Sequence, residues 1–541
     1  MVWLLNDVYD VEHRAYFMSE KKMELTPLKI RSHGASSVMH YDERYTPYIE
    51  MTGLLPFVQL VSRSTPNLNV AAVTALIDRW RSETHSFHLR TGEMTVTLQD
   101  VSMITALPIE GKPLCMSTDS EGWRQQMEAL IGMSPQEPEV EDGGKKDRVP
   151  AGATFTWIAA NFAHCPEDAD DEVIQRYARV YMWYVISRTI FADGTGKNAP
   201  WMWLKALTVF DNKFSWGSAA LAYLYRQLDD ACRRTTKDGG VGGCMLLLLW
   251  DLVSEVASEV NLLYKQYTNE MDSLTPEQVE WEPYGVGTNF GDAHTFELNP
   301  LCVQERHLWL MRCPLICNWA VEFHLPHRVL RQFGYFQPHP PEWVDTDTQL
   351  HRLDRRRQRK IKDWQKHHKS YVLTFEQSVQ ATSSIQRTQY RQHCALAFSN
   401  YLRWFQESTR VEICPPAYEE DILEEPTEYD ELAQGGYSKL IREGYQTSFA
   451  PVLNFVAADD MTLKAFQRSA YMLKPRKEFK RYSPDDYAKG KNPVAGGSRL
   501  SRMRSMDDEV EDDDDDESDD PEQFVVARRK KLVSKRGLGP K

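Results

Sequence analysis

The stretch of sequence that decides the fold runs from Ala75 to Cys115 and reads ALIDRWRSETHSFHLRTGEMTVTLQDVSMITALPIEGKPLC. Its beginning is typical of the end of a helix that carries Trp80 and Arg81, followed by a polar turn rich in histidine and threonine. Met94–Thr97 then predicts a short strand. A second helix is predicted directly after it, because Thr97 and Asp100 have the spacing of a capping box.

The second helix is predicted to be amphipathic and to end at Pro108 and Gly111. Its apolar residues are spaced to cover one face, and they are Leu98, Val101, Ile104 and Leu107. Together with Trp80 and Phe87, we expect these side chains to hold the domain together. Arg81 and Glu83 are expected to form, at most, an exposed local ion pair, which contributes only about 0–1 kcal/mol.

Composition supports a large folded region with a charged tail. The 541 residues are 42% hydrophobic and include 15 Trp, 24 Tyr and 21 Phe, enough for a sizeable core. The formal net charge is −14, of which residues 507–541 contribute −6 with 13 acidic and 7 basic residues. The remaining chain is therefore only mildly acidic, which does not favour extensive coating of nucleic acid.

The fold class that we predict is mainly α, a single large helical globule with one or two small β-strand pairs. Helical periodicity is clear around residues 174–188, 221–228 and 394–405. We divide the chain into an irregular N-terminal lead-in (1–49), a main globule (50–370), a helical extension (371–412), a linker with short helices (413–480) and a disordered acidic, then basic, tail (481–541).

The cysteines indicate a reducing compartment. Nine are present, scattered and mostly in apolar surroundings, which is typical of reduced core thiols. The most apolar run, Cys244–Trp250, is ended by Asp251 and is too short to span a bilayer. We therefore expect no membrane association.

The wording of the first block resembles the plant mobile domain, which is also labelled the aminotransferase-like plant mobile domain. That family's block usually reads RWRPETHTFHLPxGEMTITLxDVxxLxGLPxxG, and this chain departs from it mildly at Ser82, Ser86 and Ala106. Further blocks resemble the family in the same order, namely Ala178–Leu204, Ser215–Cys232, Gly242–Leu252, Val279–Gly285 and Cys313–Pro340. The resemblance covers roughly residues 50–370.

This resemblance implies a nuclear, non-enzymatic plant factor that acts as a protein-interaction scaffold. Family members are linked to transposon silencing, genome integrity and meristem maintenance, and some are thought to act with a phosphoprotein phosphatase. The domain also occurs inside transposable elements, so a transposable-element-derived protein without a host function remains an alternative. The other alternative is a nucleic-acid-binding module.

No catalytic motif survives inspection. Gly194-Thr195-Gly196-Lys197 suggests a phosphate loop, but Phe191 stands where the first glycine is needed and Asn198 where Ser or Thr is needed. A turn is the preferred interpretation. Pyridoxal phosphate chemistry needs a lysine aldimine and a carboxylate partner, and nothing singles out such a lysine. We therefore predict no enzyme activity, no catalytic residues and no cofactor.

Two histidine-containing patterns were weighed as metal sites. Cys313, Cys317, His324 and His327 have a middle spacing much shorter than zinc fingers use. The two cysteines also lie four residues apart in an apolar run, as in a helix, which favours buried thiols. His85 and His88 lack further ligands and are expected to be turn and packing residues. We predict no metal.

Two basic segments are candidates for binding. Arg352–Lys369 has nine Lys or Arg residues against two Asp, so it could contact phosphates or an acidic partner. The alternative is a solvated linker helix whose positive charge is balanced by the acidic segment 419–431. The candidate contacts in this segment are Arg352, Arg355, Arg356, Arg357, Arg359, Lys360 and Lys362.

The second basic segment lies in the tail, after 12 acidic residues within Asp507–Asp520. Such charge blocks are typical of disordered interaction tails. The cluster resembles a nuclear import signal, so we predict a nuclear location. Its basic residues are Arg528, Arg529, Lys530, Lys531, Lys535 and Arg536.

Overall fold

Helices dominate the part of the chain that the structure, a computed structural model, describes. The described residues are 4–30, 39–63, 68–136, 150–193, 196–236, 239–248, 260–279, 281–282, 284, 300–340, 350, 361–384 and 390–413. All of them belong to one unit, Met1–Asp486, and the second unit, Tyr487–Lys541, lies outside them. The prediction of a mainly α fold is confirmed. No helix among the described residues is both long enough and apolar enough to cross a membrane.

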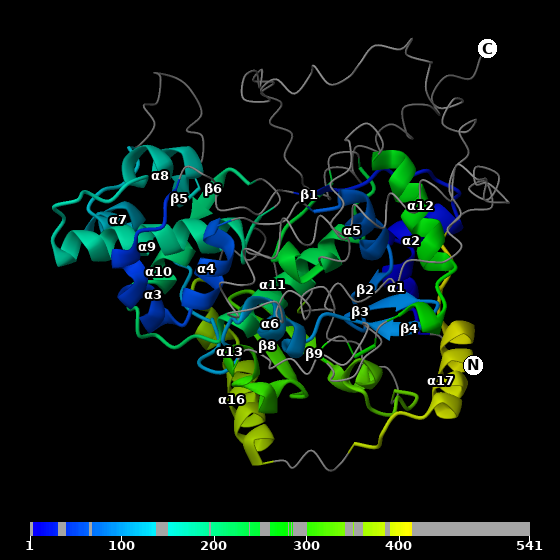
Figure 1. Ribbon diagram of the computed structural model, residues 1–541. Helices are drawn as coiled ribbons and strands as arrows, with labels where there is room; N and C mark the ends of the chain where they lie inside the picture. The colour runs from blue at the N-terminus through cyan, green and yellow to red at the C-terminus, as the bar shows by residue number, and fades with distance from the viewer. Residues whose placement is uncertain are drawn as a thin grey trace, which may run out of the picture. The chain divides into compact units, whose positions relative to one another are not determined.

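Strands form four small sheets in the described chain, more than the one or two pairs predicted. They are β1 (Lys29–Ile30) with β7 (Gly240–Val241), β2 (Trp80–Arg81) with β3 (Ser86–Leu89) and β4 (Gly92–Met94), β5 (Gly152–Thr154) with β6 (Asn198–Pro200), and β8 (Cys313–Cys317) with β9 (Ala320–His324). Only β1 and β7 run parallel. Each strand is five residues long or shorter. The sheets are therefore small and lie among the helices (Figure 1).

The N-terminal segment, predicted to be irregular, contains short helices that contribute to the core. Helix α1 (Asp7–Asp10) begins where the Asn6 side chain accepts a hydrogen bond from the Val8 amide. Helix α2 (Arg14–Ser19) begins in the same way at His13, whose side chain accepts from the Ala15 amide. Ala15 and Met18 are fully buried. The sequence shows no helical period here because each helix is at most six residues long.

The block Ala75–Cys115 follows the prediction in part. Helix α5 (Val70–Ile77) ends before Trp80 and Arg81, which instead form strand β2. Of the predicted strand Met94–Thr97 only Met94 is a strand residue, at the end of β4, and the predicted polar turn contains strand β3. The capping box is confirmed, because Thr97 and Asp100 cap helix α6 (Leu98–Thr105) reciprocally. The helix ends at Ala106, which adopts a left-handed conformation with φ of 50°.

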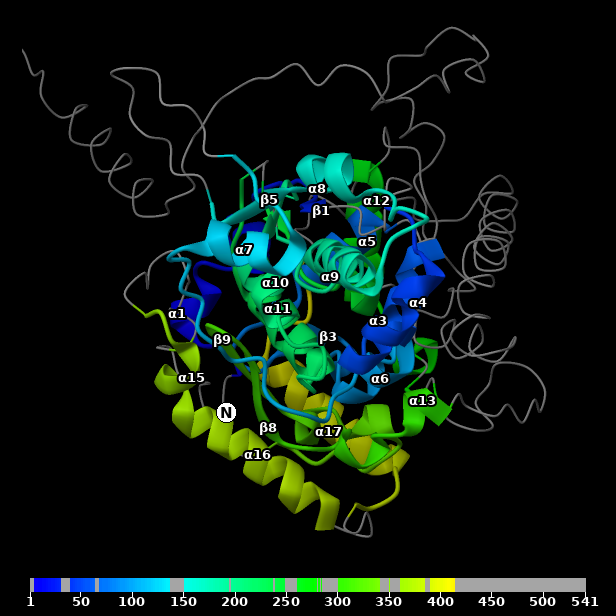
Figure 2. The same cartoon turned by 90° about the vertical axis from the view of Figure 1, so that its left-hand side faces the viewer.

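Helices α9 (Asp171–Arg188) and α11 (Trp216–Ala231) supply much of the core, and both confirm the predicted periodicities. Helix α11 approaches α6 closely through Gly217, where an added Cβ would lie 2.8 Å from Cγ1 of Val101. Around α9 lie three short helices, α7 (Trp123–Ile131), α8 (Phe155–Phe162) and α10 (Trp201–Ala206) (Figure 2). The glycine therefore allows the backbone of α11 to pack directly against the Val101 side chain of α6.

The hairpin β8–β9 corrects the prediction for the run CPLIC. Cys313 and Cys317 lie at the two ends of β8, not on one face of a helix. Both thiols are buried and free, as expected. Helix α11 lies against this hairpin, and α16 (Lys369–Ser384) lies against β8. An apolar run of five residues fits a buried strand as well as a helix, and strand pairing decides between them.

The remaining helices complete the described chain. They are α3 (Thr46–Thr52), α4 (Leu55–Arg63), α12 (Val260–Asp272), α13 (Pro300–Val303), α15 (Trp364–His367) and α17 (Ala395–Ser408), with short 3-10 turns η1 (Glu43–Tyr45), η2 (Met245–Leu248), η4 (Pro276–Gln278), η5 (Arg306–Leu308), η6 (Pro326–Arg328) and η7 (Leu330–Phe333). Helix α17 confirms the helix predicted around residues 394–405.

Candidate functional site

The most unusual feature of the described chain is a run of buried ionisable residues between α5 and α6. From residue 71 to residue 98 only Arg90 is exposed. We call the acidic, arginine and histidine members of this run, together with Trp80, the polar hub; they are Asp78, Arg79, Trp80, Arg81, Glu83, His85, His88 and Glu93. Burying a charge is costly unless it is paired, so the partners of these side chains define what the hub does.

The first hub residues bind the N-terminal segment and α12. Asp78 pairs with Arg14, with 2.5 Å between Oδ1 and Nε, and it also accepts a hydrogen bond from Tyr264 Oη. Arg79 Nη2 lies 2.5 Å from Asp272 Oδ1 at the end of α12. Burial raises the pKa of Tyr264 well above its usual value, with the neighbouring Asp78 acting in the same direction. The phenol therefore stays neutral and donates to Asp78.

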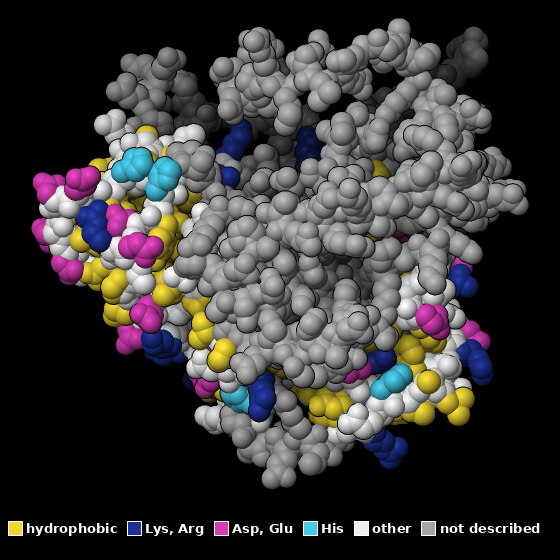
Figure 3. Space-filling model, viewed as in Figure 1, with side chains coloured by type: hydrophobic (Ala, Val, Ile, Leu, Met, Phe, Trp, Pro, Cys, Tyr) yellow, Lys and Arg dark blue, Asp and Glu magenta, His cyan; other side chains and the backbone are white. Residues whose placement is uncertain are grey.

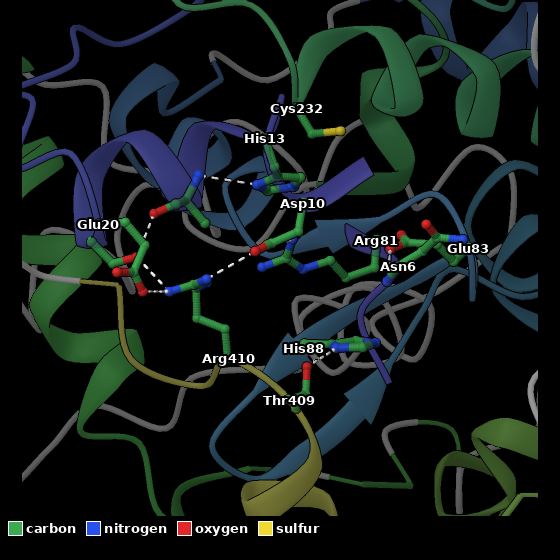
Figure 4. Close-up of polar contacts among 12 residues, drawn as sticks. Asn6, Asp10, His13, Glu20, Arg81, Glu83, His88, Cys232, Thr409 and Arg410 are labelled. Atoms are coloured by element: carbon green, nitrogen blue, oxygen red, sulfur yellow. Dashed lines mark hydrogen bonds and ion pairs between the residues drawn. The ribbon is translucent and has the colours of Figure 1, made fainter. Parts of the chain in front are cut away.

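Figure 4 shows a second part of the hub, in which Asp10 lies between two guanidinium groups. Arg81 Nη1 donates to Asp10 Oδ1 over 3.0 Å, and Arg410 Nη2 donates to Asp10 Oδ2 over 2.9 Å. Arg410 also contacts Glu20 at 2.8 Å. Burial lowers the pKa of Arg81, whereas the carboxylates of Glu83 and Asp10 act in the opposite direction. One carboxylate on α1 thus joins strand β2 to the chain after α17.

The expectation that Arg81 and Glu83 form an exposed local pair is wrong, because both side chains are buried. Glu83 accepts a hydrogen bond from the backbone amide of Asn6 over 3.1 Å. Burial raises the pKa of Glu83, and the nearby Arg81 partly offsets this effect. These residues hold distant segments together, a role that their closeness in sequence does not indicate.

The histidines of the hub use both ring nitrogens. His88 Nδ1 lies 2.6 Å from Thr409 Oγ1, and its Nε2 lies 3.0 Å from Thr84 Oγ1. Burial lowers the pKa of His88 well below its usual value, and Arg81 adds to this effect. A neutral imidazole is therefore the form that connects β3 to the residues after α17. His85 and His88 are expected to be turn and packing residues; His85 lies in a turn, and His88 is a buried packing residue that belongs to strand β3.

The last hub residue binds the chain near η6. Arg328 Nε and Nη2 donate to the two carboxylate oxygens of Glu93, over 2.6 and 2.8 Å. Ser86 Oγ donates to Glu93 as well, over 2.8 Å. A two-pronged arginine–carboxylate pair of this kind is among the stronger charge-assisted contacts in proteins. The block whose sequence resembles the family therefore binds segments that are distant in the chain.

A surface pocket of about 460 Å³ lies beside this network. Its lining residues are Glu20, Arg90, Gln406, Thr409, Arg410, Val411 and Glu412. The charged residues in its wall form two ion pairs: Arg90 lies 3.0 Å from Glu412, and Arg410 lies 2.8 Å from Glu20. The pocket is therefore of mixed charge and shows no preference for an anion or a cation.

Most of the binding residues predicted from sequence lie outside the described residues. This applies to Arg352, Arg355, Arg356, Arg357, Arg359 and Lys360, and to the import cluster Arg528, Arg529, Lys530, Lys531, Lys535 and Arg536. Lys362 is described, and its ammonium lies 3.0 Å from Asp119 and 3.6 Å from Glu121. The next residues are anchored by Trp364, which is fully buried and donates to Thr118 Oγ1 over 2.9 Å.

The other motifs weighed from sequence do not assemble into a site. Gly196 donates its amide to the Asp193 side chain as in a turn, while Gly194 and Thr195 lie outside the described residues. His324 Nδ1 donates to the Met311 carbonyl, and its Nε2 accepts from the Leu98 amide. Among the described residues, the one group with converging metal-ligand atoms is His85, Asp229 and Glu322, not the Cys313–His327 set.

Comparison with known proteins agrees with the resemblance of the sequence blocks to the plant mobile domain. A profile described as the plant mobile domain matches residues 56–253 and 241–406, well over half of the chain. The chain belongs to the plant mobile domain family. The match extends past residue 370, where the sequence analysis ended the main globule, and it reaches helix α17. The domain boundaries proposed from sequence otherwise stay predictions.

Three curated proteins similar to this plant mobile domain chain come from Arabidopsis thaliana. Serine/threonine-protein phosphatase 7 long form homolog is 30% identical over 64% of this chain and 27% of its own length. Protein MAIN-LIKE 1 is 32% identical over 53% of this chain and 58% of its own. Protein MAINTENANCE OF MERISTEMS is 32% identical over 51% and 59%. The chain thus spans less than two thirds of these relatives. No solved structure matches it.

Proposed function

We propose that this plant mobile domain protein is a non-enzymatic nuclear factor that serves as a protein-interaction scaffold in transposon silencing, genome integrity and meristem maintenance. The observation that carries the proposal is the polar hub. Its ionisable side chains, which would be the natural candidates for chemistry, are committed to partners on α1, α12, η6 and the residues after α17. Such a network supports a rigid frame for binding surfaces rather than a reaction centre.

A phosphoprotein phosphatase is the partner that we propose. One relative is named a protein phosphatase 7 homolog, and its similarity to this chain covers only 27% of its length. The similar segment therefore occurs in one polypeptide with a much longer remainder. Domains that are fused in one protein commonly associate as separate chains in another, and this supports an association between this domain and a phosphatase. The meristem role is supported by the name of another relative.

The described surface gives little support to the alternative of a nucleic-acid-binding module. Figure 3 shows Asp and Glu side chains gathered at the left-hand end, in the region of α7–α9. Residues 167–172 there read EDADDE, and their acidic members are exposed. Acidic residues at the start of α9 suit the helix dipole and repel phosphates. Within the described part of the basic segment, Lys362 already has acidic neighbours, while Lys366 and Lys369 are exposed.

Affinity purification of the tagged full chain from plant nuclei, followed by mass spectrometry, tests the scaffold. We expect a phosphoprotein phosphatase that stays bound after nuclease treatment. The matched variant changes Arg355, Arg356 and Arg357 to Gln, and it should keep the phosphatase. Partners that disappear on nuclease treatment and in this variant would instead support nucleic-acid binding.

Nuclear localisation has a separate test. Deletion of residues 528–541 from a fluorescent fusion should leave the protein in the cytoplasm, because the six basic residues of the import-like cluster are removed. A fusion in which those residues become Gln should behave identically. An undiminished nuclear signal in both would show that the cluster is not the import signal.

A further inference from the structure

Three side chains with metal-ligand atoms meet in the interior from distant parts of the chain. His85 lies in the turn between β2 and β3, Asp229 on α11, and Glu322 on β9. One ligand atom from each lies within 4.8 Å of the others, and all three residues are buried. His85 Nε2 and Glu322 Oε2 are 2.9 Å apart. Atoms at this distance share either a proton or a metal ion.

Each of the three residues is held through a second polar atom. His85 Nδ1 lies 2.9 Å from the Phe323 carbonyl, so this nitrogen carries a hydrogen and donates it. Trp80 Nε1 donates to Asp229 Oδ1 over 2.7 Å, and Arg226 Nε donates to Glu322 Oε1 over 2.6 Å. Outer contacts of this kind orient the ligands of known metal sites and fix the histidine tautomer. With Nδ1 engaged in this way, Nε2 is the ring nitrogen that faces Glu322.

The backbone and the aromatic neighbours also keep His85 in place. Its φ of 49° lies in the left-handed region, which residues other than glycine seldom adopt. Its ring stacks on Tyr225, with ring centres 5.0 Å apart, and on Trp80 at 6.2 Å. Strained backbone held by its surroundings is frequent at functional sites. The imidazole is thus pre-positioned before any ion arrives.

The three ligand side chains offer two carboxylates and one imidazole. Arg226 contacts Glu322 and the charge of Arg233 acts on Asp229, so guanidinium groups balance part of the negative charge of the carboxylates. A lone pair on Nε2 facing a carboxylate oxygen at 2.9 Å is repulsive unless a proton or a metal ion lies between them. One imidazole nitrogen and two carboxylate oxygens form a donor set that suits zinc and manganese better than calcium or copper(I).

We propose that His85, Asp229 and Glu322 bind a divalent transition-metal ion, Zn²⁺ or Mn²⁺, that ties the β2–β3 turn to α11 and β9. Because the three residues are buried and belong to distant segments, the ion would hold these segments together. The sequence predicts no metal, because its candidate patterns are Cys and His residues that lie close together along the chain. These ligands are separated by more than ninety positions each, as their numbers show, and spacing rules do not reach them.

The test uses the full chain, purified without chelators or a histidine tag. Metal content is measured by inductively coupled plasma mass spectrometry, both as purified and after refolding with Zn²⁺ or Mn²⁺ followed by desalting. We expect about one bound ion per chain, and a thermal midpoint higher by roughly 5 °C or more than in EDTA. His85→Gln and Asp229→Asn should each lose the ion.

His88→Gln is the matched control, because it changes a second buried histidine of the same block whose ring contacts Thr84 and Thr409. It should lower stability yet keep the ion. A wild-type chain that binds no ion under either condition would overturn the proposal, and the short contact would then be an ion pair with a doubly protonated His85. Retention of the ion by folded His85→Gln and Asp229→Asn chains would also overturn it, since other residues would then hold the metal.

Discussion

The polar hub and the surface beside it use the same chemistry with different consequences. In the hub, Glu93 and Arg328 are almost inaccessible to solvent and meet at 2.6 Å. At the rim of the pocket, the side chains of Arg90 and Glu412 meet at 3.0 Å but are 47% and 66% exposed. Water screens the second pair and does not reach the first. Burial, not residue type, therefore decides which ion pairs hold this protein together.

Breaking a hub pair should have the largest effect. Arg328→Ala leaves the Glu93 carboxylate buried without its two-pronged partner, and removing one member of a buried pair typically costs about 3–5 kcal/mol. Urea unfolding followed by circular dichroism should show this loss in the free energy of unfolding. A loss no larger than that of an exposed-pair variant would mean that the hub pairs are no stronger than those on the surface.

Emptying an apolar site next to the hub should cost somewhat less. Ile104 is buried on α6, so Ile104→Ala should lower the free energy of unfolding by roughly 2–5 kcal/mol. Thermal melts measured beside a pull-down check this, and Leu396→Ala is the control because Leu396 is 75% exposed. Unchanged stability with lost partner binding would identify α6 as a recognition surface instead of part of the core.

The buried histidines predict a pH dependence. Burial lowers the pKa of His324 to about 4, below the roughly 6.5 of an unfolded histidine. Between these values the unfolded chain binds a proton that the folded chain excludes, so stability present above pH 6.5 is lost as the pH falls towards 4. The slope attributable to one such group is about 1.4 kcal/mol per pH unit. Urea unfolding at pH 7.5, 6 and 5 measures it.

His324→Gln is the control for this dependence, since an amide can still contact the Met311 carbonyl or the Leu98 amide and does not titrate. It should be less stable at pH 7.5 and should show a shallower decline with acid. An identical slope in both proteins would assign the effect to other buried groups, among them His13 and His88, whose pKa values burial also lowers.

The smallest effect is expected at the pocket rim. Arg90→Ala removes an exposed partner of Glu412, so the free energy of unfolding should change by only about 0–1 kcal/mol. The change should shrink further at high salt, because ions screen exposed pairs. A loss comparable to that of Arg328→Ala would remove the distinction between the two regions, and urea unfolding at low and high salt would reveal it.

Local sequence was a good guide where side-chain chemistry and period act within one element. The capping box of Thr97 and Asp100, and the burial of Trp80, Phe87 and Ile104, follow from contacts within a few residues or from apolar side chains leaving water. The run CPLIC was assigned wrongly, because five consecutive apolar residues fit a buried helix and a buried strand equally well. Its pairing with Ala320–His324 is what made it a strand.

The mainly helical fold and the family-like Ala75–Cys115 block can be read from the sequence alone. The contacts that make this block important to the fold appear only in the tertiary structure. Arg79 meets Asp272, Glu93 meets Arg328, and His85 meets Glu322 across separations of 193, 235 and 237 residues. Charged residues look like surface residues to any local pattern. Their burial becomes affordable only when folding brings the opposite charge alongside, and that information lies in no single segment.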